Sequence, residues 1–314
     1  MKKILVSGSL AYDKIMDFPG KFSDYILPDK IHNLNVSFGI DSIQDNFGGT
    51  AGNIAYNLAL LQEQPVIFST AGNDFKKYKN WLELKNINTS KIITVKNVPT
   101  ATAYITTDQS DNQITGFFMG AMKTQAENIS VEDLKDARLA IVSPGNKKDM
   151  VHFSRFYKKN NMRYIFDPGQ AVPSFHPQEL SECIMGAWAL IANDYEISFI
   201  LEKTKLTKHK ILERCDAVII TLGEKGSSIE LQKEKYEIPV AKPKNVSDPT
   251  GAGDAYRAGL IKGIIHSFPW EVCGRLGAAV SAYTVEKYGT QTHEFTIEDV
   301  KKRYRENFGE EINI

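Results

Sequence analysis

A short segment, residues 248–259 with the sequence DPTGAGDAYRAG, combines a glycine turn with a carboxylate at the start of a helix. Gly251 and Gly253 permit the turn, and the apolar residues after it repeat at helical spacing. Small residues at a helix start leave backbone N–H groups that can bind an anion. Asp254, in the first turn, would be a carboxylate placed to accept a proton from an attacking hydroxyl beside that anion. The competing interpretation is that Asp254 only caps the helix.

The spacing of the glycines excludes two common phosphate-binding loops. The chain holds no GxxxxGK[ST] segment, which a P-loop requires, and its glycines do not fit the GxGxxG pattern of dinucleotide-binding domains. Any nucleotide site must therefore be built on a different loop.

Short apolar runs rich in Val and Ile recur along the chain, each followed by turn residues and then by a helical pattern. Such runs are typical of strands buried on both faces, as in a parallel sheet covered by helices. The sequence therefore predicts an α/β fold with a doubly wound, mostly parallel sheet. Because ligands bind outside the carboxyl ends of the strands in such sheets, the residues after each run are candidates for a site. The runs are residues 4–7, 66–70, 139–143, 164–166, 189–192 and 218–221.

Two stretches, residues 14–47 and 100–118, break this rhythm and alternate as half-exposed strands do. Within them we expect strands at residues 36–38, 103–105 and 113–118, which would form a small β lid over the main sheet. The open edges of such a lid would either close over a substrate or pair with a second chain in a homodimer. No linker separates the stretches from the rest, so residues 1–314 are predicted to form one domain.

Composition narrows the class of protein. Lys and Arg number 38 and Asp and Glu also 38, so no net charge draws in nucleic acid or an anionic membrane. Three scattered cysteines, with no histidine at ligand spacing, argue against disulfides and structural zinc. No apolar run reaches the 18 residues of a membrane span. The apolar stretch near the first residue is too short for the apolar part of a signal peptide. We therefore expect a cytoplasmic protein with a small-molecule substrate.

Two long motifs resemble the signatures of the PfkB, or ribokinase-like, family of carbohydrate and nucleoside kinases. They are residues 248–254 (DPTGAGD) and 48–55 (GGTAGNIA), about 200 residues apart in the family's order. The resemblance extends over essentially the whole chain. It implies that Asp254 is the catalytic base and that backbone amides of the preceding loop form an anion hole. The amides are those of Gly251, Ala252 and Gly253, and Pro249 stands in that loop where the family usually has Thr.

The same resemblance assigns residues to ATP and Mg²⁺. Asn193 and Glu196 match the family's N-x-x-E motif, in which the Glu holds Mg²⁺ through water. The same spacing is also that of a capping box, and both interpretations can hold together. Asp167 matches a family residue that lies near the phosphates of ATP. The alternative is that Asp167 only forms a structural turn. The segment with Thr221, Gly223 and Gly226 resembles the family's nucleotide loop, which lines the ribose of ATP.

The acceptor side of the site is predicted from the segment GSLAYD, residues 8–13. Its resemblance to the family's substrate-binding segment assigns Ser9 and Asp13 to the acceptor, with Asp13 accepting hydrogen bonds from two sugar hydroxyls. A carboxylate suits a vicinal diol because it only accepts hydrogen bonds and can take both protons. Gly49 and Asn53 match positions that contact the same sugar.

The family resemblance also raises the question of a monovalent cation such as K⁺. Asp248 and Thr250 match backbone ligands of the potassium site that many relatives possess beside the anion hole. The distal part of that site would fall in residues 288–293, similar to G-A-Q-x-S. His293 stands there in place of the usual Ser, so the resemblance leaves potassium dependence open.

Within the family, residues 8–13 and 111–122 look closest to bacterial and archaeal adenosine or nucleoside kinases. We therefore predict an ATP- and Mg²⁺-dependent kinase for the primary hydroxyl of a nucleoside, with adenosine the leading candidate. The first alternative is a ribokinase- or fructokinase-like sugar kinase. The second is a catalytically silent regulator, against which the intact Asp254 and Glu196 argue. Phe117 or Phe118 could pack on a base, but strand alternation lets only one of them face the cleft.

Overall fold

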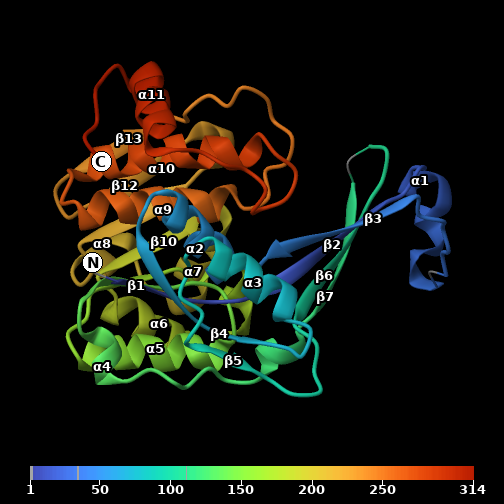
Figure 1. Ribbon diagram of the computed structural model, residues 1–314, viewed down its shortest axis with the longest axis horizontal. Helices are drawn as coiled ribbons and strands as arrows, with labels where there is room; N and C mark the ends of the chain where they lie inside the picture. The colour runs from blue at the N-terminus through green and yellow to red at the C-terminus, as the bar shows by residue number, and fades with distance from the viewer. Residues whose placement is uncertain (1–2, 34, 111) are drawn as a thin grey trace.

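A nine-stranded sheet crosses the body of the molecule in the computed structural model, which describes residues 3–33, 35–110 and 112–314 (Figure 1). Its strand order is β13-β12-β11-β10-β9-β8-β1-β4-β5, parallel from β11 to β5 and antiparallel for the last two strands at the other edge. All six predicted runs correspond to strands of this sheet, and only the run 139–143 extends beyond its strand, by one residue. The strands are β1 (Lys3–Ser7), β4 (Gln64–Ala71), β5 (Ile92–Thr94), β8 (Ala137–Val142), β9 (Tyr164–Phe166), β10 (Ala189–Asn193), β11 (Ala217–Thr221), β12 (Ser227–Glu230) and β13 (Lys235–Ile238).

Helices cover both faces of this sheet, as predicted for a doubly wound fold. Alternate strand residues enter two separate cores: in β8, Leu139 and Ile141 join one and Ala140 and Val142 the other. The first core packs against α2 (Thr50–Leu60), α3 (Lys76–Leu84), α9 (Ala252–Ile265), α10 (Trp270–Val285) and α11 (Ile297–Phe308). The second packs against α5 (Lys147–Lys159), α6 (Pro177–Gly186), α7 (Asp194–Thr204) and α8 (Lys208–Leu212), with the short α4 (Val131–Leu134) beside it.

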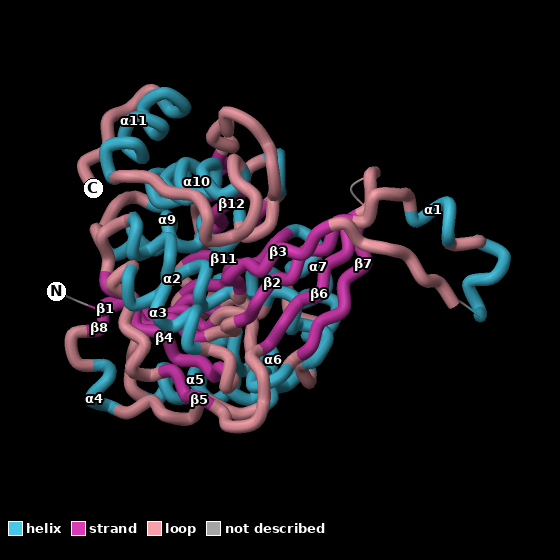
Figure 2. The backbone as a smooth tube through the Cα atoms, turned by 45° about the vertical axis from the view of Figure 1, so that its right-hand side comes forward, coloured by secondary structure: helices cyan, strands magenta, loops and turns pink. Residues whose placement is uncertain are grey.

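A second, four-stranded sheet projects from the body (Figures 1 and 2). Its order is β3-β2-β6-β7, made of β2 (Ala11–Asp17), β3 (Ser42–Gly48), β6 (Ala101–Thr107) and β7 (Gln113–Phe118). β2 pairs in parallel with β6, and both outer pairs are antiparallel. Asp13 therefore lies within a strand of this sheet.

The prediction of a strand at residues 36–38 is wrong, because residues 35–40 form no strand. They belong to an arm, residues 18–33 and 35–41, that extends beyond the far end of the small sheet (Figure 2). Phe38 packs there on the rings of Phe18 and Phe22, with ring centroids 4.6 and 5.5 Å away. The arm also carries α1 (Phe22–Tyr25) and the 3-10 helix Pro28–Asn33. The apolar residues that suggested a strand here belong to an aromatic cluster instead.

The arm is fixed to the hairpin between β6 and β7. The carboxylate of Asp108, at the hairpin turn, accepts hydrogen bonds from the backbone N–H of Phe22 and of Ser110, at 2.9 and 2.8 Å. Phe18 N–H donates to the carbonyl of Thr107. The arm and the small sheet are thus joined at a common base.

Among the described residues, no helix is both long and apolar enough to cross a membrane. The three cysteines, Cys183, Cys215 and Cys273, are buried and unpaired.

Candidate active site

A cleft of about 670 Å³ lies where the carboxyl ends of the central strands face the small sheet. Residues from the start, middle and end of the chain meet in it, because parallel strands place their carboxyl ends along one edge. Of the residues predicted from the sequence, the cleft lining includes Ser9, Asp13, Gly49, Asn53, Asp167, Asn193, Glu196, Thr221, Gly223, Thr250, Gly251, Gly253 and Asp254.

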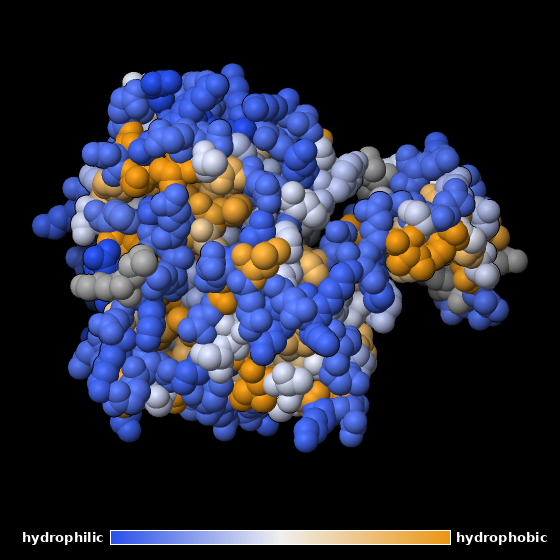
Figure 3. Space-filling view, in the orientation of Figure 1, coloured by the Kyte–Doolittle hydropathy of each residue, from blue (hydrophilic) through white to orange (hydrophobic). Residues whose placement is uncertain are grey.

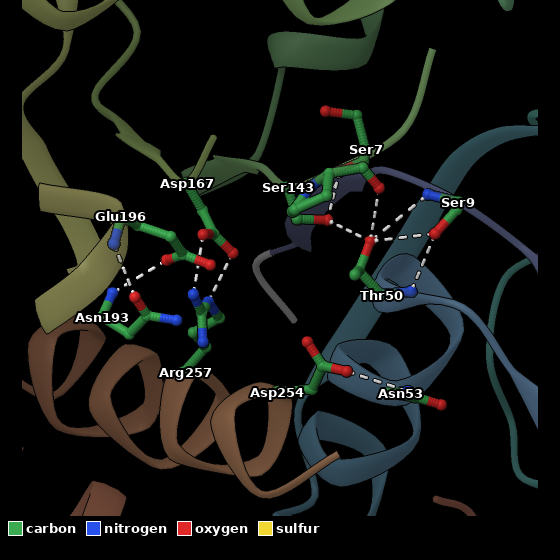
Figure 4. A network of polar contacts seen from close by, with 11 residues as sticks. Ser7, Ser9, Thr50, Asn53, Ser143, Asp167, Asn193, Glu196, Asp254 and Arg257 are labelled. Carbon is green, nitrogen blue, oxygen red and sulfur yellow. Dashed lines mark hydrogen bonds and ion pairs between the residues drawn. The ribbon is translucent and has the colours of Figure 1, made fainter. Parts of the chain in front are cut away.

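Asp254 is the third residue of α9 and does not cap it. The helix begins at Ala252, and the capping position is held by Gly251, whose φ of 80° is a left-handed conformation that glycine adopts readily. The carboxylate of Asp254 instead accepts a hydrogen bond of 2.8 Å from Nδ2 of Asn53, on the facing helix α2 (Figure 4). The capping interpretation is therefore wrong.

The environment of Asp254 changes its acidity. Burial raises the pKa of this carboxyl from 3.8 to about 7, although the charge of Arg257 and the hydrogen bond from Asn53 act in the opposite direction. A general base works best when its pKa lies near the operating pH. Asp254 therefore has the acidity expected of a proton acceptor at neutral pH.

The turn before α9 leaves free backbone donors. The N–H of Ala252 donates to the carbonyl of Pro249 at 3.2 Å, so the proline keeps the turn and this amide is partly engaged. The amides of Gly251 and Gly253 make no hydrogen bond with any described residue. Such unpaired N–H groups at a helix start, reinforced by the helix dipole, form an anion site.

Arg257 is a residue of this site that sequence reasoning did not single out. Its guanidinium, only 8% exposed, donates from Nε and Nη2 to the two carboxylate oxygens of Asp167, the second bond being 2.7 Å long. A β-carbon on Gly253 would lie 2.8 Å from Nη1, so the glycine lets the guanidinium approach the loop. Its position three residues after Asp254, on the same helix face, was the signal in the sequence.

On the nucleotide side, Asn193 and Glu196 form the expected capping box at the start of α7. Glu196 N–H donates to Oδ1 of Asn193 at 2.7 Å, and Asn193 N–H donates to Oε2 of Glu196 at 2.8 Å. Burial raises the pKa of the Glu196 carboxyl, while the hydrogen bond from Asn193 opposes the rise. Because Oε1 of Glu196 makes no hydrogen bond with the described residues, the side chain can both cap the helix and hold a metal-bound water.

The segment predicted to be the nucleotide loop lies only partly in the cleft. Thr221 ends β11 and Gly223 begins the 3-10 helix Gly223–Lys225, and both line the cleft. Gly226 does not line it. A β-carbon on Gly226 would lie 2.0 Å from the carbonyl oxygen of Ile238, so this glycine is required by the close approach of two backbone segments.

On the acceptor side, Asp13 lies on the cleft-facing side of β2. Burial, with a contribution from the charge of Asp248, raises its pKa from 3.8 to about 6. In register across the small sheet, Asp13 pairs with Ala103 and Ala103 with Phe117, which places Phe117 on the same face. Phe117 lines the cleft and Phe118 does not.

The start of α2 is held by Ser9. Its Oγ accepts a hydrogen bond from the backbone N–H of Thr50 at 3.0 Å, and the carbonyl of Ser9 accepts from Ala51 (Figure 4). Gly49, with a φ of 87°, must be a glycine because a β-carbon there would lie 2.6 Å from the Ser9 carbonyl oxygen. Ser9 and Gly49 thus position Asn53 one turn further along the helix.

A second cavity of about 950 Å³ continues from the cleft between the small sheet and the body. The two share Asp13, Ile105, Thr250 and Thr290. Beyond Asp13 the second cavity is lined on the sheet side by Ile15, Gln44 and Phe18 among others. Asp13 therefore stands at the junction of two spaces, one beside Asp254 and one beneath the small sheet.

The expected potassium ligands are only partly matched. The Asp248 carboxylate accepts hydrogen bonds from the backbone N–H of Thr250 and of Gly289, at 2.9 and 3.1 Å, which ties two loops together. His293, 1% exposed, directs Nε2 at Oδ1 of Asn57, and burial lowers its pKa to about 4. A neutral imidazole supplies no oxygen where the family usually has the hydroxyl of Ser, so this ligand does not fit K⁺ as expected.

The sequence and the fold were compared with those of known proteins. The family described as pfkB family carbohydrate kinase matches residues 20–296. A nucleoside kinase of Methanocaldococcus jannaschii is 33% identical over 309 residues, which cover 96% of this chain and 97% of that protein.

Solved structures give the same result. The nucleoside kinase of Burkholderia thailandensis in complex with inosine superimposes with a TM-score of 0.89 at 36% identity, covering 98% of this chain and 99% of that one. In complex with ADP-inosine, the same kinase gives a TM-score of 0.87 at 37% identity, with 98% and 97% covered. The similarity therefore includes both the body and the small sheet.

Proposed function

Since the chain belongs to the PfkB family of carbohydrate kinases, and is thus a phosphotransferase acting on a hydroxyl group, we propose that it transfers the γ-phosphoryl group of ATP to a nucleoside. The acceptor is the 5′-hydroxyl, and adenosine is the leading substrate. The observation that carries the proposal is the half-buried Asp254, whose carboxylate lies beside the free amides of Gly251 and Gly253 in the same cleft as Asp13.

In the proposed reaction Asp254 accepts the proton of the hydroxyl as its oxygen attacks the γ-phosphorus. The bond from that phosphorus to the β-phosphate oxygen breaks as the new bond forms. The amides of Gly251 and Gly253 and the guanidinium of Arg257 stabilise the charge that develops on the transferred group. Mg²⁺, held through water by Glu196, would supply further positive charge at the phosphates.

Two features support a nucleoside as the acceptor. With Asp13 binding the ribose diol, a base extends into the space beside Phe117 and Ile105, which form an apolar surface of the cleft on the same face of the small sheet. A free sugar would leave this space empty. Two proteins that resemble this chain over nearly its whole length, in M. jannaschii and B. thailandensis, are nucleoside kinases, and the second has been solved with inosine.

Activity with a panel of acceptors tests the proposal. With ATP and Mg²⁺ present, kcat/KM should be higher for adenosine than for free ribose or fructose, and inosine is the informative second nucleoside. Equal or better use of ribose or fructose would favour the sugar-kinase alternative. Phosphorylation of no acceptor would favour a nucleotide-binding regulator.

Dimerisation through the small sheet is a further part of the proposal. Strands β3 and β7 are its open edges, and every residue of β7 is exposed. Apolar surface is also visible on the adjoining arm (Figure 3), where Tyr25 and Leu27 are about half exposed. Because open edges are usually covered, we expect two chains to pair there. A species of 35.2 kDa at all concentrations in light scattering would contradict it.

A potassium ion beside the anion hole is supported only by the positions of Asp248 and Thr250, since the side chain of His293 provides no oxygen. Comparing kcat in KCl with kcat in tetramethylammonium chloride of equal ionic strength tests this part of the proposal. Equal rates would exclude a potassium requirement.

A further inference from the structure

A buried chain of hydrogen bonds lies behind Asp254. Gln291 donates from Nε2 to Oδ1 of Asn53 at 3.0 Å, and its Oε1 accepts from Nε1 of Trp81 at 3.2 Å. Asn53 in turn donates to Oδ2 of Asp254. Gln291 is 3% exposed and lines neither the cleft nor the second cavity. It is therefore connected to Asp254 through Asn53, without access to a ligand.

The two ends of this chain fix its direction. The indole N–H of Trp81 can only donate, and an ionised carboxylate can only accept. Gln291 must therefore present its oxygen to Trp81 and its nitrogen to Asn53. Asn53, whose oxygen is then occupied, must present its nitrogen to Asp254. A flip of either amide would place like groups against each other at both of its ends.

Tyr78 removes the remaining freedom of Gln291. Its hydroxyl accepts a hydrogen bond from Nε2 of Gln291 and donates to the carbonyl of Gly48 at 2.8 Å. Both hydrogens of the Gln291 amide thus have acceptors, one on Asn53 and one on Tyr78. Buried amides that are fully satisfied in one orientation are held rigidly in it.

We propose that Gln291 is a positioning residue that, through Asn53, keeps Oδ2 of Asp254 occupied and so directs the proton of the acceptor hydroxyl to Oδ1. The O–H bond of the hydroxyl breaks and the proton bonds to Oδ1. The electron pair of the hydroxyl oxygen forms the new bond to the γ-phosphorus as the bond from that phosphorus to the β-phosphate oxygen breaks and ADP leaves. Figure 4 shows the bond from Asn53 reaching one carboxylate oxygen while the other points away from Asn53. This inference rests on the proposed role of Asp254 as base.

Two substitutions at Gln291 test the inference by the pH dependence of kcat. Gln291→Met removes both amide groups without adding charge, and Gln291→Glu keeps the shape but cannot donate to Asn53 when ionised. Either change frees the Asn53 amide to turn its oxygen toward Asp254, which disfavours the ionised base. The acidic limb should move up by about one pH unit from its position near pH 7, with kcat at pH 7 about fivefold lower. KM for ATP should not change.

The outcomes separate positioning from a purely structural role. A loss of thermal stability with the acidic limb unmoved in both variants would overturn the inference, and so would a shift in Gln291→Glu alone, because that shift would come from the new charge. If the Gln291 variants do not fold, Trp81→Phe provides the test. It keeps the aromatic ring but removes the donor that orients Gln291, and a smaller upward shift is expected. If the acidic limb of Trp81→Phe lies at the same pH as that of the parent protein, the positioning role is contradicted.

Asp254→Asn, measured alongside, keeps the two proposals distinguishable. If it retains most of the parent kcat, Asp254 is not the base and the reaction step fails whatever the Gln291 variants do. If it loses activity while the Gln291 variants keep the parent pH profile, the base assignment stands and only the positioning role is overturned.

Discussion

The guanidinium of Arg257 forms a two-bonded ion pair with Asp167, and its remaining nitrogen lies against the backbone of Gly253. The two residues are 90 positions apart in the chain, and the pair is buried at the end of β9. A positive charge is thereby fixed under the loop that would hold the γ-phosphate. Removing one partner of a buried pair leaves the other charge uncompensated.

The first prediction concerns this ion pair. Arg257→Met should lower the free energy of unfolding by about 3–5 kcal/mol, as expected for breaking a buried pair. It should also lower kcat by roughly 10²–10³, the usual effect of losing one donor to the developing charge. Stability is measured by denaturant unfolding and kcat with adenosine and ATP.

A second buried pair far from the cleft provides the control. Lys262 bonds Glu63 at 2.5 Å, and Glu63→Gln disturbs that pair without touching the site. It should destabilise the protein while kcat stays near the parent value. If both variants lose kcat to the same degree, the effect of Arg257 is one of stability, and its catalytic role is wrong.

The second prediction concerns Asp254 as base. Asp254→Asn should lower kcat by roughly 10²–10⁴, the usual worth of a positioned general base. Binding of ATP, followed by calorimetry, should be retained because the amides of Gly251 and Gly253 are unchanged. A variant with most of its kcat would refute the assignment.

The third prediction uses the raised pKa of Asp254, about 7 in the folded protein against 3.8 for the free group. Between these values the folded state binds more protons than the unfolded state, so the contribution of Asp254 to stability falls as pH rises from about 4 to 7. Above pH 7 the ionised carboxylate destabilises the fold by ~4 kcal/mol at most, at 1.36 kcal/mol per pKa unit. Asp254→Asn removes this charge.

The variant should therefore be more stable than the parent at pH 8 and nearly equal to it near pH 4. Other acids with raised pKa values that lie away from Asp254, such as Asp149, titrate in both proteins and cancel in the comparison. A stability difference independent of pH would contradict a pKa raised by burial.

How far the sequence predicted this structure depended on whether a feature was local. The strand runs were recognisable because a strand buried on both faces must be apolar throughout, as in β11, where Val218 to Ile220 are buried. The arm was misread because the apolar Phe38 is explained by Phe18, twenty residues away. An alternating pattern alone cannot distinguish a strand from a cluster on a loop.

The candidate site divides in the same way. The residues of the motif at 248–254 were found because their spacing carries the chemistry. The contacts that hold the site together were not predicted, since the bonds from Arg257 to Asp167 and from Gln291 to Asn53 join positions 90 and 238 apart. No local pattern marks such contacts, although both Arg257 and Gln291 lie within segments that the sequence had already singled out.

The fourth prediction is that the small sheet closes over the acceptor. Amide hydrogens of β2, β6 and β7 should exchange more slowly when adenosine is bound, because the cleft face of these strands loses access to water. Strands β12 and β13, at the far edge of the main sheet, should exchange equally in both states. Unchanged protection in the small sheet would contradict closure.

The last prediction uses two adjacent phenylalanines to distinguish a nucleoside from a sugar. Phe117, 50% exposed, lines the cleft on the same sheet face as Asp13, whereas Phe118, 42% exposed, lies on the opposite face and does not line the cleft. Stacking of a base on an aromatic ring is worth roughly 1–3 kcal/mol, so Phe117→Ala should lower kcat/KM for adenosine by about 5-fold to 150-fold. Phe118→Ala removes an equal ring one residue away and should leave kcat/KM unchanged.

Asp13→Ala completes the comparison, because it acts on the ribose and not on the base. Losing hydrogen bonds to this carboxylate should cost about 1.5–3 kcal/mol with adenosine and with ribose alike. Phe117→Ala should affect adenosine alone, since free ribose does not reach the ring. If Phe117→Ala lowers kcat/KM for both acceptors equally, the ring shapes the sugar site and does not contact a base. The nucleoside assignment would then give way to a sugar kinase, with the role of Asp254 unaffected.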